Sequence, residues 1–287
     1  MKLVSVVPMN PPVVFILAVL IYLTKGLYLG KFIGPFRRRF GEITGYWIAM
    51  SIFTVVFAVF ITLLYPKLYF IHWSFPADYF LIFLSLSILT VVPAILELKK
   101  LAGSEANYNE EFELSKNMSF GQAAFLQIIS AALPEELVFR YIFLGLLSLW
   151  NPFAGLLALS LFFGLAHKFA HPERSWKVLL SNTLAGFVLG LAYLYTKSLL
   201  VVMAIHWLDN MIFWAYIKYD RARKAIGVAV ALSLLSPVVL WDQTARFIEY
   251  LRDIFSLSGL LWGIVLGFAM LGVVYTGIKA LRGRSGR

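Results

Sequence analysis

Charged, imidazole and amide side chains occur inside segments of this sequence that are otherwise apolar. A charged group at the centre of a bilayer costs roughly 3 kcal/mol or more, so the groups that remain there are candidates for function. A carboxylate or an imidazole can activate water, and imidazole and amide N–H groups can stabilise an oxyanion. The residue types therefore point to hydrolysis at membrane depth. The candidates are Glu135, Glu136, Arg140, His167, His206, Asp209 and Asn210.

The composition indicates a membrane protein. Of the 287 residues, 61% are hydrophobic and only 14% are charged, whereas soluble domains are about half apolar and a quarter charged. Too little polar surface remains to cover a soluble core, so lipid must solvate much of the chain. With no cysteine, the chain has no disulfide, no thiolate metal site and no cysteine nucleophile.

Apolar stretches long enough to cross about 30 Å of hydrocarbon occur nine times, at about 1.5 Å per helical residue. We predict spans at 12–30, 43–65, 77–98, 119–149, 152–167, 178–196, 198–217, 225–241 and 258–278. The eighth contains Pro237, which disfavours a continuous helix. We therefore expect an all-α, polytopic membrane bundle of eight to nine transmembrane helices, with a conical cavity in its inner half.

The basic residues predict the orientation of these spans. With the N-terminus outside, 18 of the 25 Lys and Arg residues fall in inner loops or in the C-terminal tail, as the positive-inside rule requires. The net charge of +10 is explained by topology and by attraction to anionic lipid. No basic patch is left to indicate nucleic acid, so we expect membrane lipid as a partner and no nucleic acid.

The composition of two segments between the predicted spans indicates their structure. Leu101 to Lys116 is acidic and polar, as expected of a solvated cytoplasmic connector. Thr244 to Ser256 gathers its apolar residues on one helical face, which is typical of a helix lying in the membrane interface. Within the spans, Gly186 to Gly190 and Gly263 to Gly267 have GxxxG spacing, which lets helices pack closely.

The candidate residues share a depth. Measured from the outer helix ends, they lie between the middle of the bilayer and its inner half, so three helices can surround a polar cavity that opens toward the cytoplasm. Glu136 and Arg140 are four residues apart and are expected to form an ion pair. Glu135 is rotated about 100° from Glu136 and has no cation on its own helix, so the two carboxylates should point in different directions. An unpaired carboxylate beside two histidines is suited to general-base work on water.

Three motifs in order resemble those of a known family. Glu135–Arg140 (EELVFR) matches EExxxR, Phe163–His167 (FGLAH) matches FxxxH, and His206–Asn210 (HWLDN) matches HxxxN. Residues 120 to 215 thereby resemble the type II CAAX prenyl endopeptidases and the related CPBP intramembrane proteases. The family core usually has eight transmembrane helices, so the ninth span predicted here is a departure.

The resemblance implies roles for these residues. Glu135 and His167 would activate the attacking water, and His206 and Asn210 would stabilise the oxyanion. Glu136 and Arg140 would support the structure of their helix, and Pro134 would bend it. The implied activity is cleavage near the C-terminus of a membrane-associated, prenylated CaaX-type peptide, without a cofactor or a metal ion. The resemblance also implies an integral, multi-pass location, in the cell membrane if the host is a prokaryote.

Two other functional classes remain open from the residues alone. Glu135, His167 and His206 make a possible His2Glu zinc site, although the chain has no HExxH. A transporter or scaffold could instead use buried Glu and His to relay protons or to bind a ligand. A rhomboid-like serine protease is disfavoured, because no serine stands in a GxSxG setting. We divide the chain into N-terminal helices with the cytoplasmic loop (1–118), a catalytic core (119–217) and C-terminal helices (218–287).

Overall fold

The computed structural model describes residues 10–68, 74–101, 117–170, 175–219 and 221–282. Within these ranges every regular element is helical, which confirms the all-α prediction. The acidic connector predicted at 101–116 lies almost wholly outside the described residues. The elements are α1 (Pro11–Phe40), α2 (Glu42–Leu64), η1 (Pro66–Leu68), α3 (Ala77–Leu101), α5 (Phe120–Gln127), η2 (Ile128–Ala132), α6 (Leu133–Glu135), η3 (Glu136–Leu144), α7 (Gly145–Ser148), α8 (Pro152–Ala170), α9 (Trp176–Thr196), α10 (Leu199–Lys218), α11 (Ala222–Ser233), α12 (Ser236–Val239), α13 (Trp241–Ile254) and α14 (Leu257–Arg282).

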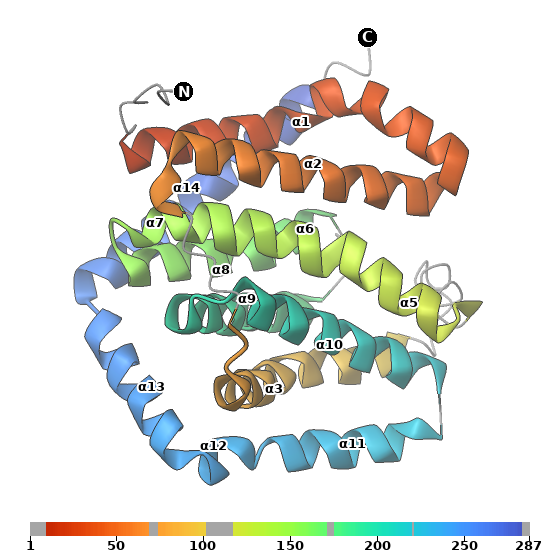
Figure 1. Ribbon diagram of the computed structural model, residues 1–287, viewed down its shortest axis with the longest axis vertical. Helices are drawn as coiled ribbons and strands as arrows, with labels where there is room; N and C mark the ends of the chain where they lie inside the picture. The colour runs from red at the N-terminus through yellow and green to blue at the C-terminus, as the bar shows by residue number, and fades with distance from the viewer. Residues whose placement is uncertain (1–9, 69–73, 102–116, 171–174, 220, 283–287) are drawn as a thin grey trace, which may run out of the picture.

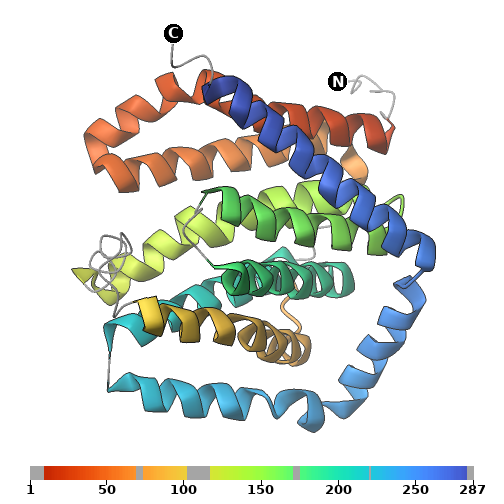
Figure 2. The same ribbon diagram turned by 180° about the vertical axis from the view of Figure 1, so that it is seen from behind.

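The helices form a layered bundle (Figure 1). The α1–α2 hairpin lies at one edge, the continuous rod from α5 to α7 lies next to α8 in the middle, and α3 packs with α9 and α10 beyond it. At the far edge lie α11 and α12. Seen from behind, α14 runs diagonally across the bundle and packs along α8 (Figure 2).

Several helices can cross a membrane by length and apolar composition. Within the described residues these are α2, α9 and α10, and the number rises to five if the bent pairs formed by α1 and by α11–α13 each count as one span. Shorter apolar helices run through Ala77–Thr90, Pro152–His167 and Leu257–Val273. The protein is therefore an integral, multi-pass membrane protein.

The eighth predicted span is not one continuous helix. The helix that begins at Ala222 ends at Ser233, α12 starts at Ser236, and the chain then bends by 76° into α13. Pro237 stands in the first turn of α12, where its missing N–H has no helical partner to lose. The span predicted over 225–241 thus consists of two helical segments, and Pro237 stands where the second one begins, as its disfavouring of a continuous helix predicts.

The amphipathic helix predicted over 244–256 is present as α13, which crosses the ends of the bundle helices in Figure 1. Phe247 is buried on this helix and packs edge-on against Phe83 and Tyr195. Ile248 and Phe255 remain exposed. The apolar face is thus divided between the bundle and the surroundings.

Glycines bring the helices together where GxxxG spacing predicted close packing. A Cβ atom at Gly190 would lie 2.5 Å from Leu156 Cδ1, and one at Gly263 would lie 2.8 Å from Leu157 Cβ. Both partners belong to α8, so the two motifs seat α9 and α14 against the same helix. Gly164 of α8 is tighter still, because its Cβ would lie 1.9 Å from Thr183 Oγ1 on α9.

Candidate functional site

The helix that carries Glu135 and Glu136 departs from α-helical geometry. It starts with a capping box, in which Ser119 Oγ accepts from the Gln122 backbone N–H and Gln122 Oε1 accepts from the Ser119 backbone N–H. It then becomes π-helical at Ile128, returns to α-helix at Leu133 and becomes π-helical again from Glu136 to Leu144. π-Helical segments inside α-helices are frequent at functional sites.

The change of hydrogen bonding has a local cause and a distant partner. Pro134 has no N–H to donate to the preceding turn. One residue earlier, the Leu133 N–H donates to Ile128 O, five residues back, instead of to Ile129 O. The released Ile129 carbonyl accepts a hydrogen bond from Ser51 Oγ on α2, at 2.6 Å. A serine on another helix therefore supports the irregular turn beside the site.

Glu136 is fully buried and has two partners. Its Oε1 accepts from Arg140 Nη1 at 3.1 Å, which is the ion pair predicted from the i, i+4 spacing. The same oxygen lies 2.6 Å from His206 Nδ1 on α10. A carboxylate oxygen can only accept from this nitrogen, so Nδ1 of His206 carries the proton. Glu136 thus pairs with Arg140 on its own helix and also connects this helix to α10 through His206.

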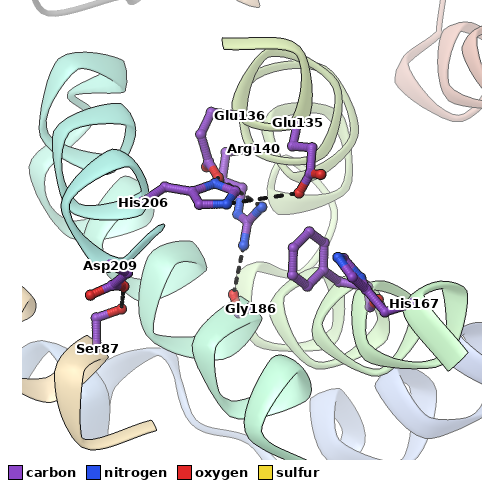
Figure 3. Close-up of polar contacts among 9 residues, drawn as sticks. Ser87, Glu135, Glu136, Arg140, His167, Gly186, His206 and Asp209 are labelled. Carbon is purple, nitrogen blue, oxygen red and sulfur yellow. Dashed lines mark hydrogen bonds and ion pairs between the residues drawn. The ribbon is translucent and has the colours of Figure 1, made fainter. Parts of the chain in front are cut away.

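Glu135 lies on the other edge of the same imidazole, as Figure 3 shows. Its Oε2 is 4.0 Å from His206 Nε2, which is an ion-pair distance and too long for a hydrogen bond. Its side chain is 27% exposed, whereas that of Glu136 is fully buried. No hydrogen-bond partner of Oε2 occurs in the described part of the chain. Glu135 therefore retains an unused acceptor close to a histidine.

The expected separation of the two carboxylates needs a correction. An α-helical rotation of 100° should give them different surroundings, yet both approach His206. Two features explain this: the helix changes from α to π between the two residues, and an imidazole presents its two nitrogens on different edges. The carboxylates differ in burial and partners, but they share one ring.

Arg140 connects the acidic cluster to two further helices. Its Nη2 donates to the Gly186 carbonyl of α9 at 3.4 Å, and its guanidinium lies 4.7 Å from the ring centroid of Phe163 on α8. A Cβ atom at Gly186 would lie 3.2 Å from Phe163 Cδ1, which is tighter than ordinary contact. Arg140 is buried because three groups surround it: the Glu136 carboxylate, the Gly186 carbonyl and the Phe163 ring.

His167 stands one turn after Phe163 on α8 and is half-buried. Its Nδ1 lies 2.8 Å from the Phe163 carbonyl oxygen, and its ring centroid lies 4.5 Å from that of Phe163. A carbonyl oxygen cannot donate, so Nδ1 is the protonated nitrogen and a neutral His167 presents an acceptor at Nε2. Neither a hydrogen bond nor an ion pair links His167 to Glu135 among the described residues.

Asn210 and Asp209 follow His206 on α10. Asn210 lies one helical turn beyond His206 and is half-buried, and no contact among the described side chains ties it to the acidic cluster. Asp209 is buried, and its Oδ2 accepts from Ser87 Oγ on α3. The sequence indicates Asp209 as a candidate but does not indicate its partner. That partner is Ser87, a polar residue inside the apolar stretch 77–98.

Of the predicted residues, the structure gathers Glu135, Glu136, Arg140 and His206 into one contacting cluster. His167 is tied to this cluster only through Phe163, and Asn210 only through its own helix. Within the described ranges, no three His, Asp or Glu side chains are grouped closely enough to hold a metal ion. The geometry provides one free carboxylate, one oriented imidazole and one neutralised carboxylate–guanidinium pair.

Residues 118–212 match the family described as type II CAAX prenyl endopeptidase Rce1-like. The match covers the helices from α5 to α10 that hold all the candidate residues. Comparisons with curated proteins and with solved structures gave no significant match.

Proposed function

We propose that the protein is an intramembrane endopeptidase that uses an activated water, because residues 118–212 match the type II CAAX prenyl endopeptidase Rce1-like family of peptide-bond hydrolases. Its substrate is a membrane-associated peptide, prenylated and of the CaaX type, cut near its C-terminus. The observation that carries the proposal is Oε2 of Glu135, which has no hydrogen-bond partner among the described residues and lies beside His206, whereas Oε1 of the neighbouring Glu136 is held by both Arg140 and His206.

Glu135 is the proposed general base. A base for water needs an acceptor that is not already engaged. Oε2 of Glu135, on a side chain that is 27% exposed, has no hydrogen bond among the described residues, whereas Oε1 of Glu136 is committed to Arg140 and His206. His167 is its proposed helper, because the Phe163 carbonyl holds the proton on Nδ1 and leaves Nε2 to accept one. After attack, the proton taken from water passes to the leaving amine.

His206 and Asn210 are the proposed oxyanion donors. Nδ1 of His206 already donates to Glu136, so Nε2 can donate to an oxyanion only when the ring is protonated. A protonated His206 and Arg140 carry two positive charges, and Glu135 and Glu136 carry two negative ones. The cluster is then neutral overall, which favours keeping the imidazolium at membrane depth. The Asn210 amide, one turn further on, supplies the second donor.

An apolar groove supports a lipidated substrate. A cavity of about 260 Å³ lies between α1, α8 and α14, and one of about 390 Å³ adjoins it and shares Phe15, Ile16 and Leu266. The smaller cavity is lined by Tyr22, whose ring packs edge-on against Phe139, four residues after Glu135. A prenyl chain seated here stays in apolar surroundings while its cysteine approaches Glu135.

For the membrane arrangement we propose nine spans with the N-terminus outside, the α11–α12 helix counting as the eighth. The site then lies in the inner half and opens to the cytoplasm, with α13 in the outer interface. The division at 118 and 217 is retained, since the motifs all lie between these positions.

A cleavage assay on the purified protein tests the function. Farnesylated and unmodified CaaX peptides are incubated with the wild type, with Glu135→Gln and with Glu249→Gln, which removes an exposed carboxylate on α13. We expect cleavage of the farnesylated peptide and a loss of about 10²- to 10⁴-fold in kcat for Glu135→Gln, the usual contribution of a general base. Glu249→Gln should match the wild type.

Two results would overturn the proposal. Wild-type turnover by Glu135→Gln would remove Glu135 from the chemistry. Loss of activity with a chelator, restored specifically by zinc, would replace the water activation proposed here by metal activation.

A further inference from the structure

Lys25 is a charged residue in the first span. The apolar segment from Pro11 to Gly30 contains no other Asp, Glu, Lys or Arg. The Lys25 side chain, on α1, is half-buried. An ammonium group at this depth is costly unless it has a partner, so its retention indicates a task.

The surroundings of Lys25 lead directly to the proposed active site. Its Nζ lies 3.5 Å from the ring centroid of Tyr22, one turn earlier on α1. The Tyr22 ring packs edge-on against Phe139 and Phe143 of η3, at 6.5 and 5.8 Å between centroids. Phe139 stands four residues after Glu135 in the same rod of helices. Tyr22 therefore links Lys25 to the helix that carries the proposed base.

Lys25 is nevertheless not paired with Glu135. Among the described residues Lys25 has no hydrogen bond and no ion pair, and its ammonium group lies over the Tyr22 ring. The other cations of the site are committed, since Arg140 holds Glu136 and Gly186 O, and His206 holds Glu136. An additional anion that enters the site therefore has Lys25 as its free cationic partner within the described part of the chain.

A peptide that is cut near its C-terminus brings such an anion. In a CaaX sequence the α-carboxylate lies three residues beyond the prenylated cysteine, which is about 10 Å in an extended chain. The apolar groove runs along α1 from Phe15 to Leu23, and Lys25 follows two residues beyond its end on the same helix. A lipidated cysteine near Glu135 can therefore direct its lipid into the groove and its carboxylate toward Lys25.

We propose that Lys25 Nζ binds the C-terminal α-carboxylate of the substrate and so selects peptides with a free C-terminal acid. This inference rests on the proposed function, because it assigns a subsite of the same active site. The cation–anion contact stabilises a charge that would otherwise enter the membrane unpaired. The contact also selects the number of residues between the cleaved bond and the C-terminus, since an extra residue would place the carboxylate beyond Lys25.

Binding measurements on a protein that cannot cleave test the subsite. In the Glu135→Gln background, affinities are measured for a farnesylated CaaX peptide as free acid and as C-terminal amide, with Lys25, Lys25→Met or Lys25→Arg. We expect the acid to bind at least about tenfold more tightly than the amide with Lys25 and Lys25→Arg, and equally with Lys25→Met. Lys67→Met, at an exposed position in η1, is the matched control and should keep the preference.

The outcomes separate this inference from the proposed function. An acid-to-amide ratio that Lys25→Met leaves unchanged overturns the subsite, even if the wild type cleaves the peptide. In the cleaving protein, Lys25→Met should raise KM for the acid and leave KM for the amide unchanged. An equal fall of kcat for both peptides would show that Lys25 acts on Glu135, which also overturns it. Absence of cleavage by the wild type is a separate result that overturns the proposed function.

Discussion

Every residue of η3 is buried inside the protein, whereas α11 and α12 expose large apolar side chains over much of their surface. Both regions contain branched apolar residues of similar kind. Val138 in η3 is 0% exposed, and Val239 at the end of α12 is 78% exposed. The difference is therefore one of packing partner: neighbouring helices surround η3, and the outer face of α11–α12 is left for the membrane.

The comparison also concerns polar groups. In η3, Glu136 and Arg140 are tolerated because each has a partner on another helix in addition to the other. In the described part of α11 and α12, charge occurs only near the start, at Arg223 and Lys224. Charge is therefore buried where other helices supply partners, and the exposed arm carries charge only in its first turn. Three substitutions test this, in order of expected effect.

Removing Glu136 should be the most damaging change. Glu136→Leu leaves Arg140 and His206 without their shared carboxylate, and breaking a buried pair in this way costs about 3–5 kcal/mol. Thermal unfolding in detergent measures the loss, with Glu249→Gln as an exposed control. An unfolding temperature of Glu136→Leu equal to that of the wild type would mean that the pairing does not stabilise η3.

Filling the α8–α9 contact should have an intermediate effect. The new Cβ of Gly164→Ala would lie 1.9 Å from Thr183 Oγ1, so the helices must separate, at a cost of about 1–3 kcal/mol. Gly121→Ala is the matched control, because nothing lies within 4 Å of the Cβ position there. Adding Thr183→Ala should restore part of the stability. If both glycine variants unfold alike, close packing at Gly164 is unimportant.

The smallest effect is expected on the exposed arm. Val239→Gln should change the stability of the detergent-solubilised protein by less than about 0.5 kcal/mol, because the side chain has few protein contacts to lose. Val138→Gln, the same substitution in η3, buries an amide and should destabilise strongly. Equal unfolding temperatures for the two variants would remove the distinction between the two regions.

Much of the architecture follows from local sequence. The helical positions, the Glu136–Arg140 ion pair and the close approach of helices at the GxxxG glycines were all predictable, because each depends on spacing along one helix. The break before Pro237 was less predictable, since a proline marks a disruption without showing whether the helix bends, restarts or ends.

The partners across helices were not predictable in the same way. Glu136 accepts a hydrogen bond from His206, Asp209 accepts one from Ser87, and the Ile129 carbonyl accepts one from Ser51 Oγ. The partners are 70, 122 and 78 residues apart in the sequence. The π-helical turn before the two glutamates depends on such a contact, because Ser51 Oγ donates a hydrogen bond to the released Ile129 carbonyl. No periodicity of the segment itself encodes that partner.

What the sequence by itself determined is that this chain is a helical membrane protein with ionisable residues at one depth, since apolar length and helical rise suffice for that conclusion. The tertiary structure decided that Glu136 Oε1 pairs with Arg140 and His206, while Glu135 Oε2 has no hydrogen bond among the described residues, and it packed Tyr22 of α1 against Phe139. Burial and pairing depend on how distant helices pack, and this packing gives two neighbouring glutamates different surroundings.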